Sequence, residues 1–448
     1  MMNRLIILLI IAALFLPGQS EAQDTQPSAM SLQEAVDYGL VHNQYILNAK
    51  LDMVSAQAVT KEYIAAGLPQ ITASIDIADN FELPTSFLPA EFFGGGSGDP
   101  AIPVQFGTKY SGNATISATQ MVFDGVFFVG LEAARTFQEL SSKDHIKAKI
   151  DVVEAVTKAY YNVLVNKLTL ELIEKNYGRL DTLLNETKAM YESGFAERID
   201  VSRVQVQYNN IKVNKNNTVK MVAIAESLLK FQMGMSIETP LTLTDELSLE
   251  MFNDAEEENF NYDQRVEYSI LQTRERLAML DIKRIKVDYL PKLDLYANIG
   301  AVAGTGAGAN LFNLGNEWFN YGLVGLRMKI PIFDGLQKHR AVQQREAKLD
   351  KVHNSYELLK NSIDLEIQQT RVTYTNSVDF MNVQMENVKI SEEVYNVTKT
   401  KYQQGVGSNI EVINADADYK EAQTNFFTAL YSALLSKVDY DKALGKLN

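Results

Sequence analysis

Four short stretches of the chain alternate apolar and polar residues with a period of two. They cover residues 70–79, 110–123, 292–303 and 321–333. A period of two is typical of a strand that has one apolar and one polar face. We therefore predict four amphipathic strands, arranged along the sequence as two pairs.

Much longer stretches lack proline. The chain has ten prolines, and none of them lies in residues 104–239 or 332–448. Because proline inside a helix costs about 3 kcal/mol, such runs favour helices. A single helix of such length would extend about 100 Å, so we expect side-by-side packing as a coiled coil or tube. The predicted long helices cover 126–193, 199–233, 336–404 and 410–444.

Glycine interrupts the helical stretches once in each half of the chain. The interruptions lie at Gly194 and at Gly405 with Gly407. Glycine adopts the left-handed backbone conformation that ends many helices. Each interruption therefore predicts the tip of a long helical hairpin.

The two halves of the chain repeat one plan. The segment Tyr191 to Gly194 corresponds to Tyr402 to Gly405, with an offset of 211 residues that persists to the ends of the hairpins. A shorter helix is predicted before each strand pair, over about 31–66 and 263–289. We therefore predict tandem repeats over 23–250 and 251–448, each with the order helix, strand, strand, long helix, turn, helix.

A Phe-Asp-Gly triplet ends the second strand of each pair. The triplets contain Asp124 and Gly125 in the first half, and Asp334 and Gly335 in the second. Aspartate accepts hydrogen bonds from the free amides of a first helical turn, and glycine permits a tight change of direction. We predict a strand-to-helix turn at each triplet, in which the aspartates cap helices and have no transport role of their own.

Residues 1–22 have the pattern of a secretory signal peptide. Arg4 precedes an apolar run over 5–16, and small residues at Ser20 and Ala22 suit a cleavage site. The alternative, a membrane anchor, is disfavoured because a spanning helix needs about 20 apolar residues. We expect cleavage after Ala22 and export. Because no later run reaches about 18 apolar residues, we expect any membrane insertion to use strands.

The composition opposes several classes of function. A net charge of −14 does not supply the basic face that a nucleic-acid partner requires. The absence of cysteine excludes disulfides, thiolate zinc sites and a lipidated cysteine. The four histidines lack metal-binding spacing, and no phosphate loop or nucleophile motif is present. We expect no enzymatic activity, no cofactor, no metal and no nucleic-acid partner.

Four strands are too few to cross a membrane alone. A sheet in lipid cannot keep an unpaired edge, and the smallest common barrels have about eight strands. Aromatic residues in the loops 81–110 and 304–321 resemble an interfacial girdle, although they are also compatible with a loop packed on a soluble sheet. If the strands insert, several copies of the chain must share one barrel.

This order of elements, repeated behind a signal peptide, closely resembles the TolC-like outer-membrane efflux proteins. The resemblance covers essentially the whole mature chain and rests on several motifs together. They are Leu68-Pro69-Gln70, the two Phe-Asp-Gly triplets, the tip segments 191–201 and 402–412, and the glycine-terminated helix ends at Gly234 and Gly445.

The resemblance implies a mainly α protein with a transmembrane β-barrel portion. Three copies would share a twelve-stranded barrel in outer-membrane lipid, continuing into a periplasmic α-helical coiled-coil tunnel. The helical tips would meet a periplasmic adaptor, or membrane fusion, protein bound to an inner-membrane transporter. The duct would conduct substrates passively for an efflux pump or a type I secretion system. The alternative function is a soluble periplasmic coiled-coil scaffold or adaptor, which leaves the strand pairs unexplained.

The resemblance also implies a pore constriction on the helix after the second glycine turn. Glu411 and Asn414 occupy the positions where the best known pattern has two acids, and Asp418 extends the same face. A ring of one carboxylate per subunit still attracts cations, although less than two would. The alternative is an ordinary solvated helix face.

The tips carry one departure from the family pattern. A basic residue that latches the tips in many members is replaced by Gly407, whereas its partner in the first half, Asp200, is present. The resemblance implies adaptor contacts around Gly194, Asp200, Gly405 and Gly407.

Overall fold

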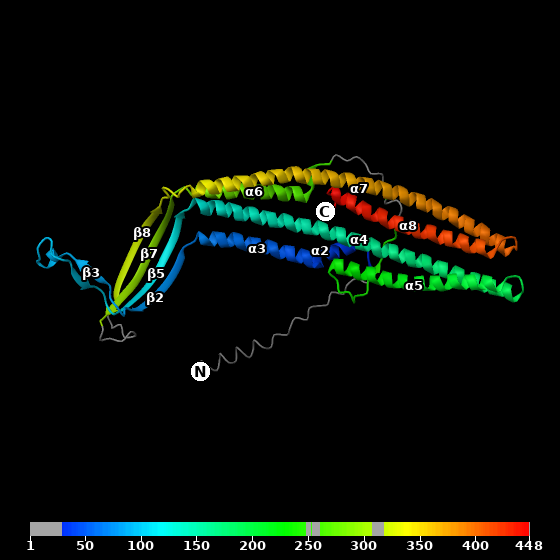
Figure 1. Cartoon of the computed structure of the whole chain (residues 1–448), viewed down its shortest axis with the longest axis horizontal. Coiled ribbons are helices and arrows are strands. Elements are labelled where there is room, and N and C mark those ends of the chain that lie inside the picture. Colours follow the sequence, from blue (N-terminus) through cyan, green and yellow to red (C-terminus); the bar gives the residue numbers. More distant parts are fainter. Residues whose placement is uncertain (1–28, 248–251, 253–259, 307–317, 448) are drawn as a thin grey trace, which may run out of the picture. The chain divides into compact units, whose positions relative to one another are not determined.

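The computed structural model describes residues 29–247, 252, 260–306 and 318–447. The expected signal peptide, the boundary between the predicted repeats and most of the loop 304–321 lie outside the described residues. Figure 1 shows the order of helices and strands along the chain.

The chain forms two compact units. The first comprises Met1–Gly39, Ala155–Asn253 and Gln384–Tyr431, and the second comprises Leu40–Glu154, Asp254–Val383 and Ser432–Asn448. Each unit takes segments from both halves of the sequence. The two compact units therefore have different boundaries from the two predicted tandem repeats.

The second unit contains an antiparallel four-stranded sheet of order β2-β5-β7-β8. Its strands cover Gln70–Asp79, Tyr110–Phe123, Lys292–Thr305 and Phe319–Lys329. The last strand ends four residues before the predicted limit of 333, since Pro331 cannot donate to a ladder. Strands β2 and β8 each have one partner in this sheet, so both are edge strands.

Cross-strand register gathers apolar side chains on one face of this sheet. One row across the four strands consists of Ile71, Ala118, Ala297 and Val324. The next row contains Ile299, again with apolar partners on β2 and β5. Ile71 is 70% exposed, Ile299 69% and Val324 76%. The apolar face is therefore uncovered within the described chain.

The opposite face of the sheet is polar. The hydroxyl oxygens of Thr115 and Tyr321 lie 2.5 Å apart, and the Thr115 hydroxyl donates to Asn113 Oδ1 at 2.9 Å. Arg327 lies over the ring of Tyr296, 4.7 Å from its centroid. The predicted alternation of apolar and polar residues thus becomes a sheet with two chemically different faces.

The loop between β2 and β5 contains a hairpin that the sequence analysis did not predict. Strand β3 (Thr85–Leu88) pairs antiparallel with β4 (Ile102–Gln105), and a 3₁₀ helix, η2 (Ala90–Phe93), lies between them. The prolines and glycines of this segment favour a loop over strands, so the sequence pattern did not indicate the two short strands. Phe81 is 92% exposed and Phe92 79% exposed.

The helix predicted over residues 31–66 is broken into α2 (Leu32–His42) and α3 (Gln44–Ala66). Asn43 between them is extended, and its side chain accepts a hydrogen bond from the Tyr45 amide at 2.8 Å. Asparagine is among the best N-cap residues, so it starts a new helix here. In the second half, the 3₁₀ helix η4 (Tyr262–Gln264) precedes α6 (Val266–Val287).

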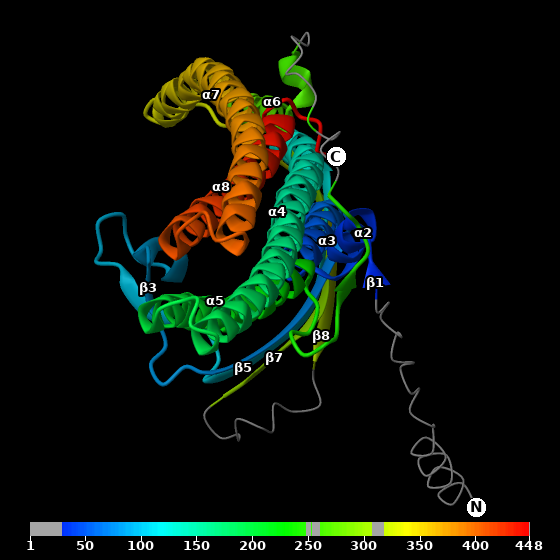
Figure 2. The ribbon, with the colours of Figure 1, turned by 90° about the vertical axis from the view of Figure 1, so that its right-hand side faces the viewer.

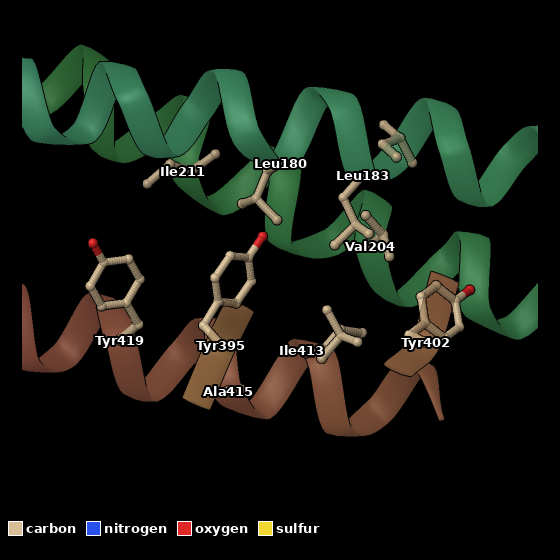
Figure 3. Close-up of a cluster of buried hydrophobic side chains, with 11 residues drawn as sticks. Leu180, Leu183, Val204, Ile211, Tyr395, Tyr402, Ile413, Ala415 and Tyr419 are labelled. Carbon is tan, nitrogen blue, oxygen red and sulfur yellow. The ribbon is translucent and has the colours of Figure 1, made fainter. Parts of the chain in front are cut away.

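Four long helices form the hairpins. They are α4 (Gly125–Glu192), α5 (Arg198–Met233), α7 (Gln337–Gln403) and α8 (Asn409–Ala443). In the first unit their facing sides form a buried cluster, to which each helix contributes (Figure 3). Leu180, Val204, Tyr395 and Val412 represent α4, α5, α7 and α8 in it. A short parallel pair, β1 (Ala29–Met30) with β6 (Thr242–Leu243), completes this unit.

No helix within the described residues has an apolar stretch long enough to cross a membrane.

Candidate functional site

The two hairpin tips are closed by the same backbone motif. Gly194 has φ +79° and Gly405 has φ +77°. The amide after each glycine donates back across the turn, from Phe195 to the Met190 carbonyl at 2.8 Å and from Val406 to the Lys401 carbonyl at 3.0 Å. This is a Schellman motif, which needs glycine because a Cβ disfavours the left-handed region.

Each tip then starts its second helix with a reciprocal cap. The Glu197 amide donates to Asp200 Oδ2 at 3.2 Å, and the Glu197 side chain accepts from the Asp200 amide. The Ser408 amide likewise donates to Glu411 Oε2 at 3.4 Å, and the Glu411 amide donates to Ser408 Oγ at 3.4 Å. Asp200 and Glu411 therefore both cap the start of the second helix of their hairpin.

The three constriction candidates share one exposed face of α8. Glu411, Asn414 and Asp418 are all exposed, whereas Val412 and Tyr419 are buried against the other helices. The exposed face continues with Glu421 and is accordingly acidic. An exposed acidic face is compatible with the lining of an aqueous passage and equally with an ordinary solvated helix surface. Glu411 caps the start of α8 in either case.

Asp200 and Gly407, the two latch positions, each have close neighbours within their own hairpin. Asp200 contacts Arg203, with 3.4 Å between Oδ1 and Nη1. A Cβ at Gly407 would lie 3.2 Å from the Tyr402 amide nitrogen and 3.3 Å from the Lys401 Cβ. The backbone at Gly407 is thus packed tightly on the last turn of α7.

A buried ion pair crosses between α4 and α8 in the same unit. Arg179 lies 2.8 Å from Asp416, whose side chain is 4% exposed. Lys420, one turn further along α8, also contacts Asp416. The Arg179 guanidinium lies over the rings of Tyr395 and Tyr419, 4.6 and 4.9 Å from their centroids. One carboxylate therefore compensates two cations at the centre of the four helices.

Burial governs protonation in this network. It raises the pKa of Tyr395 to about 12, and it lowers the pKa of Lys420 against the attraction of Asp416. The sequence analysis did not single out Asp416 and missed this ion pair. Asp416 falls four residues after Val412 and three before Tyr419, both buried, and this spacing was the available signal.

The two strand-to-helix turns differ from each other, although one common turn was predicted. At the first, the Val126 amide donates to Asp124 Oδ1 at 2.8 Å, and α4 begins at Gly125 itself. A Cβ at Gly125 would lie 3.2 Å from the Val287 carbonyl oxygen. Glycine is therefore needed for close packing against the end of α6.

At the second turn the backbone is left-handed. Gly335 has φ +65° and Leu336 has φ +66°, so α7 begins only at Gln337. The Lys338 amide donates to Asp334 Oδ2 at 3.2 Å. Although partial desolvation opposes it, this bond and the Lys338 ammonium hold the pKa of Asp334 below its usual range. Both aspartates cap helices, through turns of different geometry.

Among the described residues, no group of three or more acidic or histidine side chains is arranged to hold a metal ion.

Comparison with known proteins adds three findings. A family model described as outer membrane efflux protein matches residues 271–446. The chain is 20% identical over 339 residues to outer membrane protein TolC of Vibrio cholerae, covering 75% of this chain and 77% of that protein. It is 22% identical over 420 residues to the probable efflux pump outer membrane protein TtgC of Pseudomonas putida, covering 93% and 83%.

The fold is also found in a solved structure. The outer membrane protein VceC of Vibrio cholerae superposes with a TM-score of 0.70 at 14% identity, covering 92% of this chain and 96% of that one. The chain is similar in sequence and in fold to the TolC-like outer-membrane factors. This similarity supports a location in the outer membrane with the helical part in the periplasm, and the proteins matched are outer-membrane efflux proteins.

Proposed function

We propose that three copies of this chain form one continuous conduit, a shared barrel in the outer membrane that continues into a periplasmic helical tunnel. In this proposal β8 of one copy pairs with β2 of the next, so that the twelve strands close. The conduit passively carries substrates delivered by a periplasmic adaptor and an inner-membrane transporter, in efflux or in type I secretion.

The observation that carries the proposal is the uncovered apolar face of the sheet, bounded by two edge strands. Ile75 on that face is 74% exposed, and Val324 is 76% exposed. Lipid acyl chains would cover such an apolar face. Closure of the sheet into a barrel would pair the backbone amides of the two edge strands, and an unpaired amide in hydrocarbon costs several kcal/mol. A soluble periplasmic scaffold leaves both the face and the edges in water.

The hairpin tips supply the adaptor contact in this proposal, and the acidic face of α8 supplies the constriction. Gly194, Asp200, Gly405 and Gly407 lie in the two turns and their caps. Glu411, with Asn414 and Asp418, then forms a ring of carboxylates and amides when three copies assemble, which attracts cations.

The orientation is tested with single cysteines, because the natural chain has none. Phe92→Cys in the β3–β4 loop is expected to react with a membrane-impermeant maleimide on intact cells. Ser193→Cys at a hairpin tip is the matched control and is expected to react only after the outer membrane is permeabilised. Equal protection of both cysteines on intact cells, with the protein in the soluble periplasmic fraction, overturns the proposal.

A further inference from the structure

A cleft of about 490 Å³ lies between three of the long helices in the first unit. Its lining residues come from α4, α5 and α8, and α4 lies between the other two helices in both views of the chain (Figures 1 and 2). The cleft adjoins the buried cluster of Figure 3, because Ile211 belongs to that cluster and also lines the cleft. Sites for small molecules in proteins usually enclose about 300 to 1,000 Å³. The cleft therefore has the size of a small-molecule site.

The lining is polar where a helix bundle is normally apolar. Lining residues recur every three or four positions along α4, which is the spacing of a helix face that packs against other helices. In a bundle this face is usually occupied by apolar side chains. Here it carries several amides and hydroxyls, joined by others from α5 and α8: Asn162, Asn166 and Asn176 on α4, Asn214 on α5 and Thr424 on α8. These groups offer hydrogen bonds to a ligand in the cleft.

The cleft contains one cation and no acid. Lys420 is the only charged residue among the described residues that line it, although the chain as a whole has a net charge of −14. Two lysines that join α4 to α5 each have a carboxylate of their own: Lys167 lies 2.9 Å from Glu226, and Lys215 lies 3.0 Å from Glu174. Neither of these ion pairs lines the cleft. The charge of the cleft is therefore set by Lys420.

The ammonium of Lys420 is compensated only in part. It contacts Asp416, which also lies 2.8 Å from Arg179, so two cations share one carboxylate and the three groups carry a net charge of +1. The Lys420 side chain is 20% exposed. Its burial lowers its pKa, and the repulsion from Arg179 acts in the same direction. A negative charge placed in the cleft is therefore favoured.

The cleft faces away from the acidic surface of α8. Lys420 follows the exposed Asp418 by two positions, which is about 200° around the helix. Thr424 and Phe427, which also line the cleft, follow Lys420 by four and seven positions and so lie on its side of α8. The body of the helix thus separates an anion in the cleft from the carboxylates of the candidate constriction.

Part of the lining is apolar and specifies the rest of the ligand. Leu172, Met221 and Phe427 line the cleft from α4, α5 and α8, respectively. A small hydrated ion such as chloride leaves this apolar surface in contact with water, whereas an organic anion covers it. The lining thus combines one cation, uncharged hydrogen-bonding groups and apolar side chains.

We propose that this cleft binds a small organic carboxylate whose charged group lies against Lys420 and whose apolar body packs on Met221 and Phe427. The amides of the lining supply further hydrogen bonds. The bound anion brings the negative charge that Lys420 and Arg179 together lack, and it thereby stabilises the hairpins. The site is built within one chain, so it does not depend on the number of copies that assemble.

The probe is 2-naphthoate, a carboxylate with a planar apolar body. Its binding to the full-length protein, extracted in an uncharged detergent, is measured by equilibrium dialysis. The matched probe is 2-naphthamide, which has nearly the same shape but no charge. Naphthoate is expected to bind at least about tenfold more tightly than naphthamide, because charge-assisted hydrogen bonds are the stronger ones. At equal concentration only naphthoate is expected to raise the melting temperature clearly.

The contribution of the cation is tested with Lys420→Gln. This variant leaves Arg179 and Asp416 as a balanced pair, and it is expected to weaken naphthoate binding by about tenfold or more. The control is Lys437→Gln, on the same helix but outside the cleft, where Lys437 lies 2.9 Å from Asp441. It is expected to leave binding unchanged.

The location of the site is tested separately by filling the cleft while Lys420 is kept. Asn214→Trp adds an indole ring from an exposed lining position on α5 and is expected to abolish naphthoate binding. Asn216→Trp adds the same ring at an exposed position on α5 that does not line the cleft. It is expected to bind naphthoate as the natural protein does.

Three outcomes overturn the proposal. The first is that the natural protein takes up no more naphthoate than Asn214→Trp does, since uptake by the detergent is common to both. The second is equal binding of naphthamide, which shows an apolar cleft without an anion site. The third is an equal loss of binding in Lys420→Gln and Lys437→Gln. All three leave the proposed duct standing, because surface labelling and the mass of the assembly test it independently.

Discussion

Asp416 on α8 lies 2.8 Å from Arg179 on α4, with its side chain 4% exposed, whereas Asp418, two residues further, is exposed. The two aspartates provide a matched pair of substitutions on one helix. A substitution at Asp416 removes a buried charge that compensates two cations, whereas a substitution at Asp418 changes only a solvated side chain.

Asp416→Asn is expected to destabilise the tip hairpins by about 2 kcal/mol, because it leaves the Arg179 guanidinium buried without a counter-charge. Hydrogen exchange of the α8 amides measures this local stability. Asp418→Asn is the control and is expected to change it by less than about 0.5 kcal/mol. Equal protection of α8 in the two variants contradicts a stabilising role for the ion pair.

Gly405 and Gly178 are expected to respond to alanine with opposite signs. Gly405 has φ +77°, so Gly405→Ala strains the tip by about 1 kcal/mol. Gly178 lies inside α4 with open space around the position of a Cβ, so Gly178→Ala stabilises by up to about 1 kcal/mol. Thermal unfolding of the solubilised protein compares the two variants. A rise in melting temperature for Gly405→Ala is incompatible with the left-handed tip.

The stability contributed by the Arg265–Glu267 pair is expected to depend on pH. Arg265 Nε lies 3.0 Å from Glu267 Oε2, and although burial opposes it, this contact holds the pKa of Glu267 below its usual 4.5. A depressed carboxyl pKa stabilises the folded state above pH 4.5, and this contribution is lost as pH falls through the lowered value.

The measurement is the difference in melting temperature between the natural protein and Glu267→Gln. We expect the variant to be less stable near neutral pH and the difference to shrink below pH 4.5. A difference that stays constant from neutral pH to well below this range contradicts the assigned ionisation.

The two faces of the sheet are expected to differ in their tolerance of charge. Ile75→Arg places a cation on the face assigned to lipid, at a cost of about 2–4 kcal/mol near the middle of the bilayer. Ser74→Arg places the same group on the polar face. The amount of protein in isolated outer membranes is therefore expected to fall for Ile75→Arg and to stay near the natural level for Ser74→Arg. The reverse order contradicts the assignment of the faces.

The constriction is tested through ion selectivity. Glu411→Gln keeps the length of the side chain but removes its charge, so cation selectivity in planar bilayers is expected to fall. Glu171→Gln removes an exposed acid on α4 and is expected to leave the reversal potential in a salt gradient unchanged. If Glu411→Gln behaves like this control, Glu411 serves only as the helix cap seen at Ser408.

Regular periodicity made the helices and strands predictable from the sequence. The alternation that marked 70–79 corresponds to β2 at Gln70–Asp79, and the long helix predicted over 336–404 corresponds to α7 at Gln337–Gln403. In a long periodic segment many residues follow the same helix or strand pattern. A single residue at one end can therefore move the boundary of the element but not change its type.

Features that depend on one residue or on distant partners were not predictable. Asn43 breaks a helix that its neighbours favour, because its side chain caps the next one. Gly125 and Gly335 occupy the same triplet but serve close packing in one turn and a left-handed backbone in the other. The partner of Asp416 is Arg179, more than two hundred residues away in the sequence. Only the folded chain brings such groups together.

The most direct test of the shared conduit is the mass of the protein extracted in mild detergent from the outer-membrane fraction, measured with the detergent contribution subtracted. The proposal predicts a single species with the mass of three mature chains, each lighter than the 50.1 kDa of the full sequence by the cleaved signal peptide. A monodisperse species of one chain, recovered from the soluble periplasm without detergent, would contradict it.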